Sequence, residues 1–344
     1  MGQTGYGKTF ALNCYLTREY AENGIPFDLL EPMGHGQHLA KVFGLEWFSL
    51  SSKNTVLNPQ DVMFAEREDQ ITHVIRLYET VLGRLLTGGQ DQNIQRGLLG
   101  NALEVAYSGF PDLQAITPDV APKTDLVVDI LSGLGDPGSR LRMLAEHLAE
   151  EIGAMCTGNG VYARFLNGET TIDLSRQGRK WIPPRVFSFH ELPPDPILQG
   201  LVNVQVLSAI RRDSLVDEQP RIIAIDEVYR LMQHPALMDF MVEAVKTFRT
   251  RRKKVISIDQ NMMLFTQGKP RFLLENSPIR VIFSQKGGMN TFTDDAAFAH
   301  FNPVHLNIIS SLPKFTFLLD IQSQGLYWLY NRPSPVEQVL FGAT

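Results

Sequence analysis

Cysteine is scarce in this 344-residue sequence, and long apolar runs are absent. The two cysteines, Cys14 and Cys156, lie far apart and belong to no CxxC or Cys/His pattern, which argues against a disulfide framework or a zinc site. No uninterrupted apolar run reaches the roughly 18 residues that a membrane span needs. The opening residues also lack the apolar core of a secretory signal. We therefore expect a protein of a reducing, cytoplasmic compartment.

Positive charge is not in excess either. Lysine and arginine number 32 against 37 aspartates and glutamates, and the formal net charge is −5. This balance argues against a protein that coats nucleic acid over its whole surface, but it leaves open a local contact with DNA through a few clustered cations. Because 44% of the residues are apolar, the chain can bury the core of one large domain or two smaller ones.

Strand and helix signals alternate in the first and the last part of the sequence. Helical spacing over residues 10–23 ends at Asn23-Gly24, and short apolar runs at 26–32 and 46–50 indicate strands. Further strands are indicated at 186–189, 221–225, 255–258 and 280–283, with helices at 196–212 and up to residue 250. This rhythm predicts an α/β fold with a mainly parallel sheet flanked by helices.

Between these two parts, the apolar residues keep helical spacing. We expect residues 1–59 to form the first part of the sheet domain, 60–157 a helical insertion, and 158–344 the remainder of the sheet domain. The pair Asn167-Gly168 lies between two alternating runs and predicts a β-hairpin over 161–174. Alternating runs at 315–321 and 326–330 predict an antiparallel hairpin at a sheet edge.

The first nine residues contain a complete phosphate-binding loop motif, G-x4-G-K-[ST]. Glycines in such a loop let backbone N–H groups surround phosphate oxygens, the lysine ammonium reaches the β- and γ-phosphates, and the hydroxyl ligates Mg²⁺. A helical pattern follows at once, which argues against a chance match in a glycine-containing turn. We expect ATP to bind at Gly2, Gln3, Thr4, Gly5, Tyr6, Gly7, Lys8 and Thr9.

A phosphate-binding loop needs a strand in front of it, and only Met1 precedes Gly2. We therefore expect the sequence to be a fragment of a longer protein or to have a start that is assigned too late. Without that strand, neighbouring strands would keep unpaired backbone groups.

Two acidic residues, Asp226 and Glu227, directly follow an apolar run that has the composition of a buried strand. Functional groups of parallel sheets gather at the carboxyl ends of the strands. We expect Asp226 to hold Mg²⁺ together with Thr9, and Glu227 to activate the attacking water. The alternative is a strand followed by the solvated acidic start of a helix.

A basic run at residues 249–254 precedes the predicted strand 255–258, which is followed by Asp259-Gln260. If this strand lies beside the strand that ends in Asp226, Gln260 is placed to sense the γ-phosphate. Arg249, eleven residues before Gln260, would then reach the nucleotide of a neighbouring subunit as an arginine finger. The alternative for the basic run is a solvated helix end that the helix dipole favours.

Taken together, these motifs resemble the TraC/TrbE-type (VirB-four) ATPases of conjugative type IV secretion systems, in the HerA–FtsK branch of RecA-like P-loop motors. The resemblance is carried, in order, by residues 2–9, Leu-Glu-Pro-Met-Gly at 30–34, Leu-Asn-Pro-Gln-Asp at 57–61, Ile-Asp-Glu at 225–227 with Tyr229, Arg249 with Gln260, Asn276, and Pro-Val-Glu at 335–337. Two positions depart from the family pattern. Glu31 replaces the usual Asp, and Asp259 stands where the family usually has Thr.

The resemblance implies a RecA-like P-loop NTPase fold, a homo-hexamer and ATP-driven work at the inner face of the cell membrane. The partners would be components of a type IV secretion or conjugation apparatus, and the work would be substrate transfer or pilus assembly. A HerA/FtsK-like DNA translocase is one alternative because it shares the same active site. A nucleotide-dependent assembly module with vestigial hydrolysis is another, and the intact Glu227 argues against it.

Overall fold

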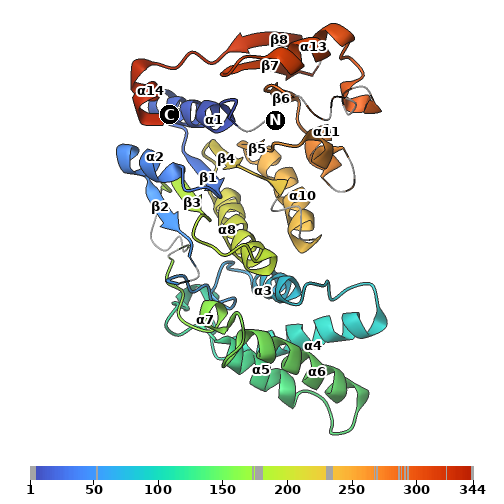
Figure 1. The fold of residues 1–344 in the computed structure, drawn as a ribbon. Coiled ribbons are helices and arrows are strands. Elements are labelled where there is room, and N and C mark those ends of the chain that lie inside the picture. The colour runs from blue at the N-terminus through green and yellow to red at the C-terminus, as the bar shows by residue number, and fades with distance from the viewer. Residues whose placement is uncertain are drawn as a thin grey trace.

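The computed structural model describes residues 5–51, 53–172, 174, 181–229, 235–266, 268, 270–285, 287, 289, 292, 294–322 and 324–341. Within them, no helix is both long enough and apolar enough to span a membrane. The chain forms an α/β part that contains the sheets and a helical part that extends away from it (Figure 1).

Five short strands form the central sheet, and all of them run parallel. The order across the sheet is β2-β3-β1-β4-β5, with bounds Phe27–Glu31 (β1), Glu46–Ser49 (β2), Arg185–Ser188 (β3), Arg221–Ile225 (β4) and Lys253–Ser257 (β5). The parallel sheet predicted from the strand–helix rhythm is therefore confirmed, and each of these five strands overlaps a predicted one.

Helices cover both faces of this sheet, as its apolar strands require. In β1, Phe27 and Leu29 belong to the apolar cluster that also contains Leu12 and Leu16 of α1 (Lys8–Asn23) and residues of α2 (Gly36–Phe43). Leu30, which points the other way, belongs to the larger cluster with α8 (Pro196–Val216) and α10 (Pro235–Thr250). Helix α1 ends at Asn23 and is capped by Gly24 in the left-handed conformation, so the predicted helix end at Asn23-Gly24 is confirmed.

The segment between β2 and β3 is helical, as its apolar spacing predicted. It contains α3 (Arg67–Val81), α4 (Gln90–Tyr107), the 3₁₀ turn η1 (Leu113–Ala115), α5 (Thr124–Gly133), α6 (Arg140–Cys156) and the short α7 (Ala163–Leu166). Its apolar residues belong to the same core cluster as those on the α8 face of the sheet. The boundaries predicted at 59 and 157 stay a prediction.

The hairpin predicted around Asn167-Gly168 is wrong. Its first arm is helix α7, because the Tyr162 N–H donates to the Met155 carbonyl and turns the chain into a helical turn directly after α6. Both predicted arms bond to residues 56 and 57 instead of to each other: the Leu57 N–H donates to the Phe165 carbonyl, and the Thr171 N–H donates to the Val56 carbonyl. A third segment thus takes the hydrogen bonds that the predicted hairpin would have formed within itself.

The last part of the chain forms a second, antiparallel sheet in the order β6-β7-β8. Its strands are Ile279–Ile282 (β6), Thr316–Ile321 (β7) and Gly325–Tyr330 (β8), and the predicted antiparallel hairpin is β7 with β8. Around it lie η2 (Met262–Phe265), α11 (Arg271–Glu275), η3 (Ala296–Phe298), α13 (Pro303–Ser311) and α14 (Pro335–Phe341). The strand expected before Gly2 lies outside the described residues.

A buried ionic network joins the starts of three neighbouring strands. The Asp28 carboxylate of β1 accepts from Arg185 Nε of β3 at 2.7 Å and from Arg221 Nε of β4 at 2.6 Å, and all three side chains are almost fully buried. Arg185 also donates from Nη1 to Asp213 of α8 at 2.8 Å. Burial alone would raise the pKa of Asp28, but the two guanidinium groups lower it to about 2.

We expect Asp28→Ala to lower the free energy of unfolding by about 3–5 kcal/mol, because it leaves two buried guanidinium groups facing one another without their shared counter-charge. Urea denaturation followed by circular dichroism measures this change. Asp129→Ala, at an exposed position of α5, is the control and should change the free energy by less than about 0.5 kcal/mol.

The contribution of Asp28 should also depend on pH. Its pKa of about 2 in the folded chain lies below the value of about 3.9 expected in the unfolded chain. The stabilisation is therefore complete above pH 4 and decreases as the pH falls toward 2. Equal acid sensitivity of the wild type and Asp28→Ala between pH 4 and pH 2 would contradict this role.

Candidate nucleotide site

Helix α1 begins directly behind the glycine-rich loop. Gly5 and Gly7 have φ values of +82° and +93°, in the region that favours glycine, and Gly7 is the residue before the first helical turn. The first N–H groups of a helix have no partner within it, so this end of α1 is suited to an anion. Gly2, Gln3 and Thr4 lie outside the described residues.

The loop before β7 packs against this glycine-rich loop. Phe315 donates its N–H to the carbonyl of Tyr6 at 3.2 Å, and its ring makes an edge contact with Phe10 of α1, with ring centroids 5.2 Å apart. A Cβ atom added to Gly7 would lie 2.7 Å from Phe315 Cδ1. The Phe315 ring therefore fills the space beside Gly7, and a larger residue fits there only if that ring moves.

Thr9 and Asp226 are in contact at the carboxyl edge of the sheet, although 217 residues separate them in the sequence. Thr9, in the first turn of α1, donates from Oγ1 to Oδ2 of Asp226 at 3.2 Å, and Asp226 directly follows β4. Burial raises the pKa of Asp226, while the Thr9 hydroxyl and the Lys8 ammonium act in the opposite direction. A hydroxyl beside a carboxylate at a helix start is a pair of oxygen ligands that suits Mg²⁺.

Lys8 lies among carboxylates at the same edge of the sheet. Partial burial lowers the pKa of its ammonium, and Asp226, Asp259 and Glu227 each act against that decrease. These acids come from two different loops, after β4 and after β5. The sequence predicted that Lys8, Asp226 and Glu227 share a site, and the structure brings them together.

Glu227 has a φ of +51°, a conformation that costs a residue other than glycine of the order of 1 kcal/mol. Such strain is found most often at functional positions. Gln260 Nε2 lies 3.4 Å from Glu227 Oε1, so the two loops after β4 and β5 present their long polar side chains to one another. The predicted neighbourhood of the two strands is confirmed by their pairing, which includes Ile225 opposite Ser257.

Arg249 lies elsewhere in the chain. It is exposed in the last turn of α10, next to the start of β5, whereas Gln260 follows the end of β5. The five residues of β5 span roughly 13 Å, so Arg249 lies toward the opposite edge of the sheet from Gln260. Its neighbours in the basic run have contacts within the chain: Lys254 Nζ lies 3.4 Å from the Tyr15 hydroxyl, and Lys253 Nζ donates to the Asp217 carbonyl at 2.6 Å.

Sequence reasoning missed two residues that shape this site. Phe315 gave no signal of this contact, because as the first residue of the alternating run at 315–321 it resembles any strand aromatic residue. Asp259 was noted only as a departure from a family pattern, yet its carboxylate accepts from the backbone N–H groups of Tyr229, Gln260 and Asn261. Its position directly before Gln260 was the only available indication.

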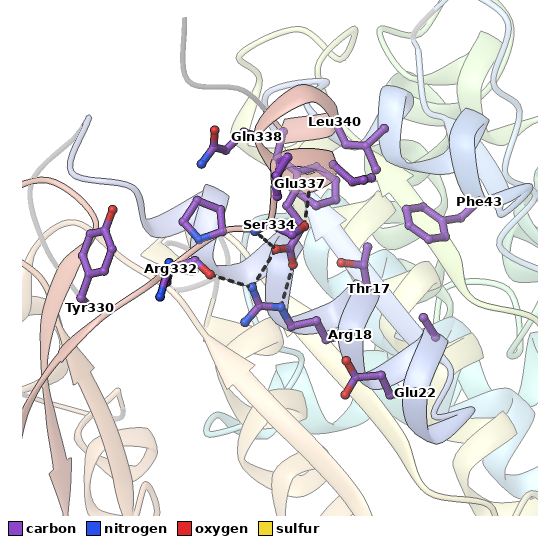
Figure 2. Close-up of a pocket in the computed structure, with 15 residues that line it drawn as sticks. Thr17, Arg18, Glu22, Phe43, Tyr330, Arg332, Ser334, Glu337, Gln338 and Leu340 are labelled. Atoms are coloured by element: carbon purple, nitrogen blue, oxygen red, sulfur yellow. Dashed lines mark hydrogen bonds and ion pairs between the residues drawn. The ribbon is translucent and has the colours of Figure 1, made fainter.

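A pocket of about 710 Å³ lies beside the second half of α1, at α14, and contains none of the predicted site residues. Figure 2 shows Arg18 and Glu337 facing one another in it, with Arg18 Nε and Glu337 Oε1 2.7 Å apart. The hydrogen bond from Arg18 lowers the pKa of Glu337 to about 2. The Glu337 carboxylate also accepts from the Ser334 N–H, and the Ser334 hydroxyl oxygen accepts from the Glu337 N–H. Glu337 therefore caps α14 and, through Arg18, joins it to α1.

Comparison with solved structures identifies the fold. VirB4 of Thermoanaerobacter pseudethanolicus superposes with a TM-score of 0.77 at 18% identity, over 98% of this chain and 89% of that one. The chain has the fold of VirB4. The bacterial conjugative coupling protein TrwB, in a form with sulphate, gives a TM-score of 0.62 at 16% identity, over 96% of this chain and 83% of that one.

A further TrwB structure, in complex with the non-hydrolysable ATP analogue ADPNP, gives a TM-score of 0.60 at 15% identity, over 97% of this chain and 84% of that one. No protein-family model and no curated protein sequence matches the chain. The RecA-like fold that the resemblance implied is therefore confirmed, as a five-stranded parallel sheet flanked by helices with the arrangement of VirB4.

The contact between Gly7 and Phe315 can be tested by comparing two glycines of the same helix. Gly7 and Gly24 precede and follow α1, and both have positive φ, but a Cβ atom on Gly24 meets nothing within 4 Å. We expect Gly24→Ala to lower the free energy of unfolding by about 1 kcal/mol, and Gly7→Ala by a further 1–3 kcal/mol or so, because only the latter displaces the Phe315 ring.

Chemical denaturation of the two variants and the wild type measures the difference. Equal losses for Gly7→Ala and Gly24→Ala would mean that the Phe315 ring moves aside at no cost.

Proposed function

We propose that this chain binds ATP with Mg²⁺ and hydrolyses it. The contact between Thr9 and Asp226 carries the proposal, because it joins the last residue of the phosphate-binding motif to the acid that directly follows β4. Lys8 beside three carboxylates, and the Glu227–Gln260 pair, support it further. The solved TrwB complex with ADPNP, which has the same fold, also supports it.

Each side chain has one task in this proposal. Lys8 binds the β- and γ-phosphate oxygens, and the N–H groups at the start of α1 surround them. Thr9 and Asp226 would hold Mg²⁺, which when bound offsets the charge of the phosphates. Glu227 orients the attacking water and accepts its proton, while Gln260 contacts the γ-phosphate.

We further propose that hydrolysis drives a motor of conjugation or type IV secretion. The likeness of the fold to VirB4 and to the bacterial conjugative coupling protein TrwB supports this role. A HerA/FtsK-like DNA translocase is the second candidate. In this proposal the chain forms a homo-hexamer, meets components of the secretion apparatus, and works in the cytoplasm at the inner face of the membrane. A direct contact with DNA belongs to the second candidate.

Lys8 and Glu227 should have separable roles. Lys8→Ala removes the phosphate-facing charge, and we expect ATP to bind about 10- to 100-fold more weakly. Glu227→Gln keeps the shape of the side chain but removes the base, so binding should stay within about threefold of the wild type while kcat falls by about 100-fold or more. Binding is measured by fluorescence with a labelled nucleotide, and hydrolysis by phosphate release.

Two exposed positions provide matched controls for this experiment. Lys41→Ala on α2 and Glu150→Gln on α6 repeat the same chemical changes away from the site and should leave both quantities unchanged. Normal turnover in Glu227→Gln would rule out its assignment as the base.

Arg249 should act across a subunit boundary, because it lies before the start of β5 whereas Gln260 lies beyond its end. Arg249→Ala should lower kcat by about 1,000-fold in homogeneous oligomers. When Arg249→Ala subunits are mixed in equal amounts with Glu227→Gln subunits, about a quarter of the interfaces combine an intact arginine with an intact base, and activity should return in proportion.

Phosphate release from mixtures of verified composition measures this recovery. Arg251→Ala, at an exposed position of the same basic run, is the control and should keep wild-type activity without mixing. No recovery in oligomers shown to contain both variants would contradict a finger that acts in trans.

A further inference from the structure

The carboxylate of Asp259 lies between the two loops that carry Glu227 and Gln260. It is only 2% exposed, yet it follows β5 at the functional edge of the sheet. One oxygen, Oδ2, accepts from the Tyr229 N–H at 2.8 Å. The other, Oδ1, accepts from the Gln260 N–H at 2.7 Å and from the Asn261 N–H at 3.0 Å.

These three hydrogen bonds use both oxygens and connect the loops at fixed points. Tyr229 is two residues after Glu227, and Gln260 is the residue after Asp259, so the carboxylate holds the backbone beside each of the two polar side chains. Further backbone bonds, from the Val228 N–H to the Ile258 carbonyl and from the Ile258 N–H to the Ile225 carbonyl, carry the β4–β5 pairing up to this point. Beyond Ile258, the Asp259 carboxylate joins the two loops in place of the backbone pairing.

The connection also bears on the strained backbone of Glu227. A residue other than glycine keeps a φ of +51° only where its surroundings impose it. On one side, the Asp226 N–H donates to the Leu30 carbonyl, and on the other, the Tyr229 N–H donates to Asp259. Glu227 is thus fixed from both sides. After Glu227, the Val228 N–H donates to the Ile258 carbonyl and the Tyr229 N–H to Asp259, so only the second of these bonds depends on the Asp259 side chain.

We propose that Asp259 is a positioning residue that keeps Glu227 and Gln260 in register for hydrolysis. The inference rests on the proposed function, because it presumes that these two side chains act on the γ-phosphate and the water. Three charge-assisted bonds occupy the carboxylate, so it holds backbone rather than a metal ion. Its charge reaches the reaction only indirectly, as one of three carboxylates near Lys8.

Neither asparagine nor threonine at position 259 would keep the connection. An asparagine has one acceptor oxygen, and its amide group would turn N–H donors toward a backbone N–H on one side. A threonine has a single hydroxyl oxygen and can serve one loop but not both. The requirement for two acceptor oxygens explains an acid at this place in this chain.

The test is Asp259→Asn, with Asp259→Thr as the second variant. Because the positions of Glu227 and Gln260 matter much more for hydrolysis than for binding, kcat should fall by about 30-fold or more while the Kd for ATP changes by less than about threefold. Asp195→Asn is the matched control: its carboxylate also accepts from a backbone N–H, that of Leu198, but it caps α8. It should leave kcat unchanged.

Hydrogen exchange gives a readout that needs no activity. In Asp259→Asn, amides of residues 226–229 and 259–261 should exchange about tenfold faster or more, with the rest of the sheet unchanged. If the wild type does not hydrolyse ATP, the proposed function fails, and this measurement still decides whether Asp259 joins the loops. Unchanged exchange overturns the inference. So does unchanged kcat in an active enzyme, and so does a loss of ATP affinity without a change in kcat, which would assign Asp259 to the charge of Lys8 instead.

Discussion

The buried Asp28 carboxylate is the interaction on which the arrangement of the sheet depends. It binds Arg185 and Arg221 at once and thereby aligns the starts of β3, β1 and β4. In a parallel sheet, aligned starts also align the ends, since each strand here has only four or five residues. A shift of β4 by one residue would turn Asp226 away from Thr9. The ionic network at one edge of the sheet therefore determines the geometry at the opposite edge, where the candidate site lies.

The two edges of the sheet differ in how their buried charges are balanced. At the amino edge, buried charges are matched: Asp28 and Asp213 are paired with arginines, which makes burial tolerable. At the carboxyl edge, the carboxylates Asp226, Glu227 and Asp259 surround one ammonium group, that of Lys8. Such an excess of acid at a partly buried place is unfavourable in the chain alone and favourable once a divalent cation is present. The composition of this edge is thus suited to a metal–nucleotide complex, whereas that of the amino edge is suited to stability.

The parts that the sequence could predict are those that depend on local pattern. The glycine-rich loop, the apolar strand before Asp226 and the Gly24 helix end each have a local signature, and the parallel sheet follows from their order. The wrong hairpin at Asn167-Gly168 and the missed contact of Phe315 have a common cause, because both depend on a segment that is distant in the sequence. Residues 54–58 take the hydrogen bonds of the expected hairpin. Phe315, more than 300 residues after Gly7, fills the space beside that glycine. Local propensity contains no information about either contact.

The junction between the sheet part and the helical part shows why a polar motif occurs inside a core. Asn58 donates from Nδ2 to the Pro122 carbonyl at 2.9 Å, and the Tyr107 hydroxyl donates to the Gln60 carbonyl at 2.6 Å. Both Asn58 and Gln60 are fully buried, so each lost hydrogen bond would leave a buried polar group without a partner. Apolar side chains could slide past one another here at little cost, but directional bonds cannot. The motif at residues 57–61 therefore fastens the segment that follows β2 to the helical part through directional bonds, inside an apolar core that the two parts share.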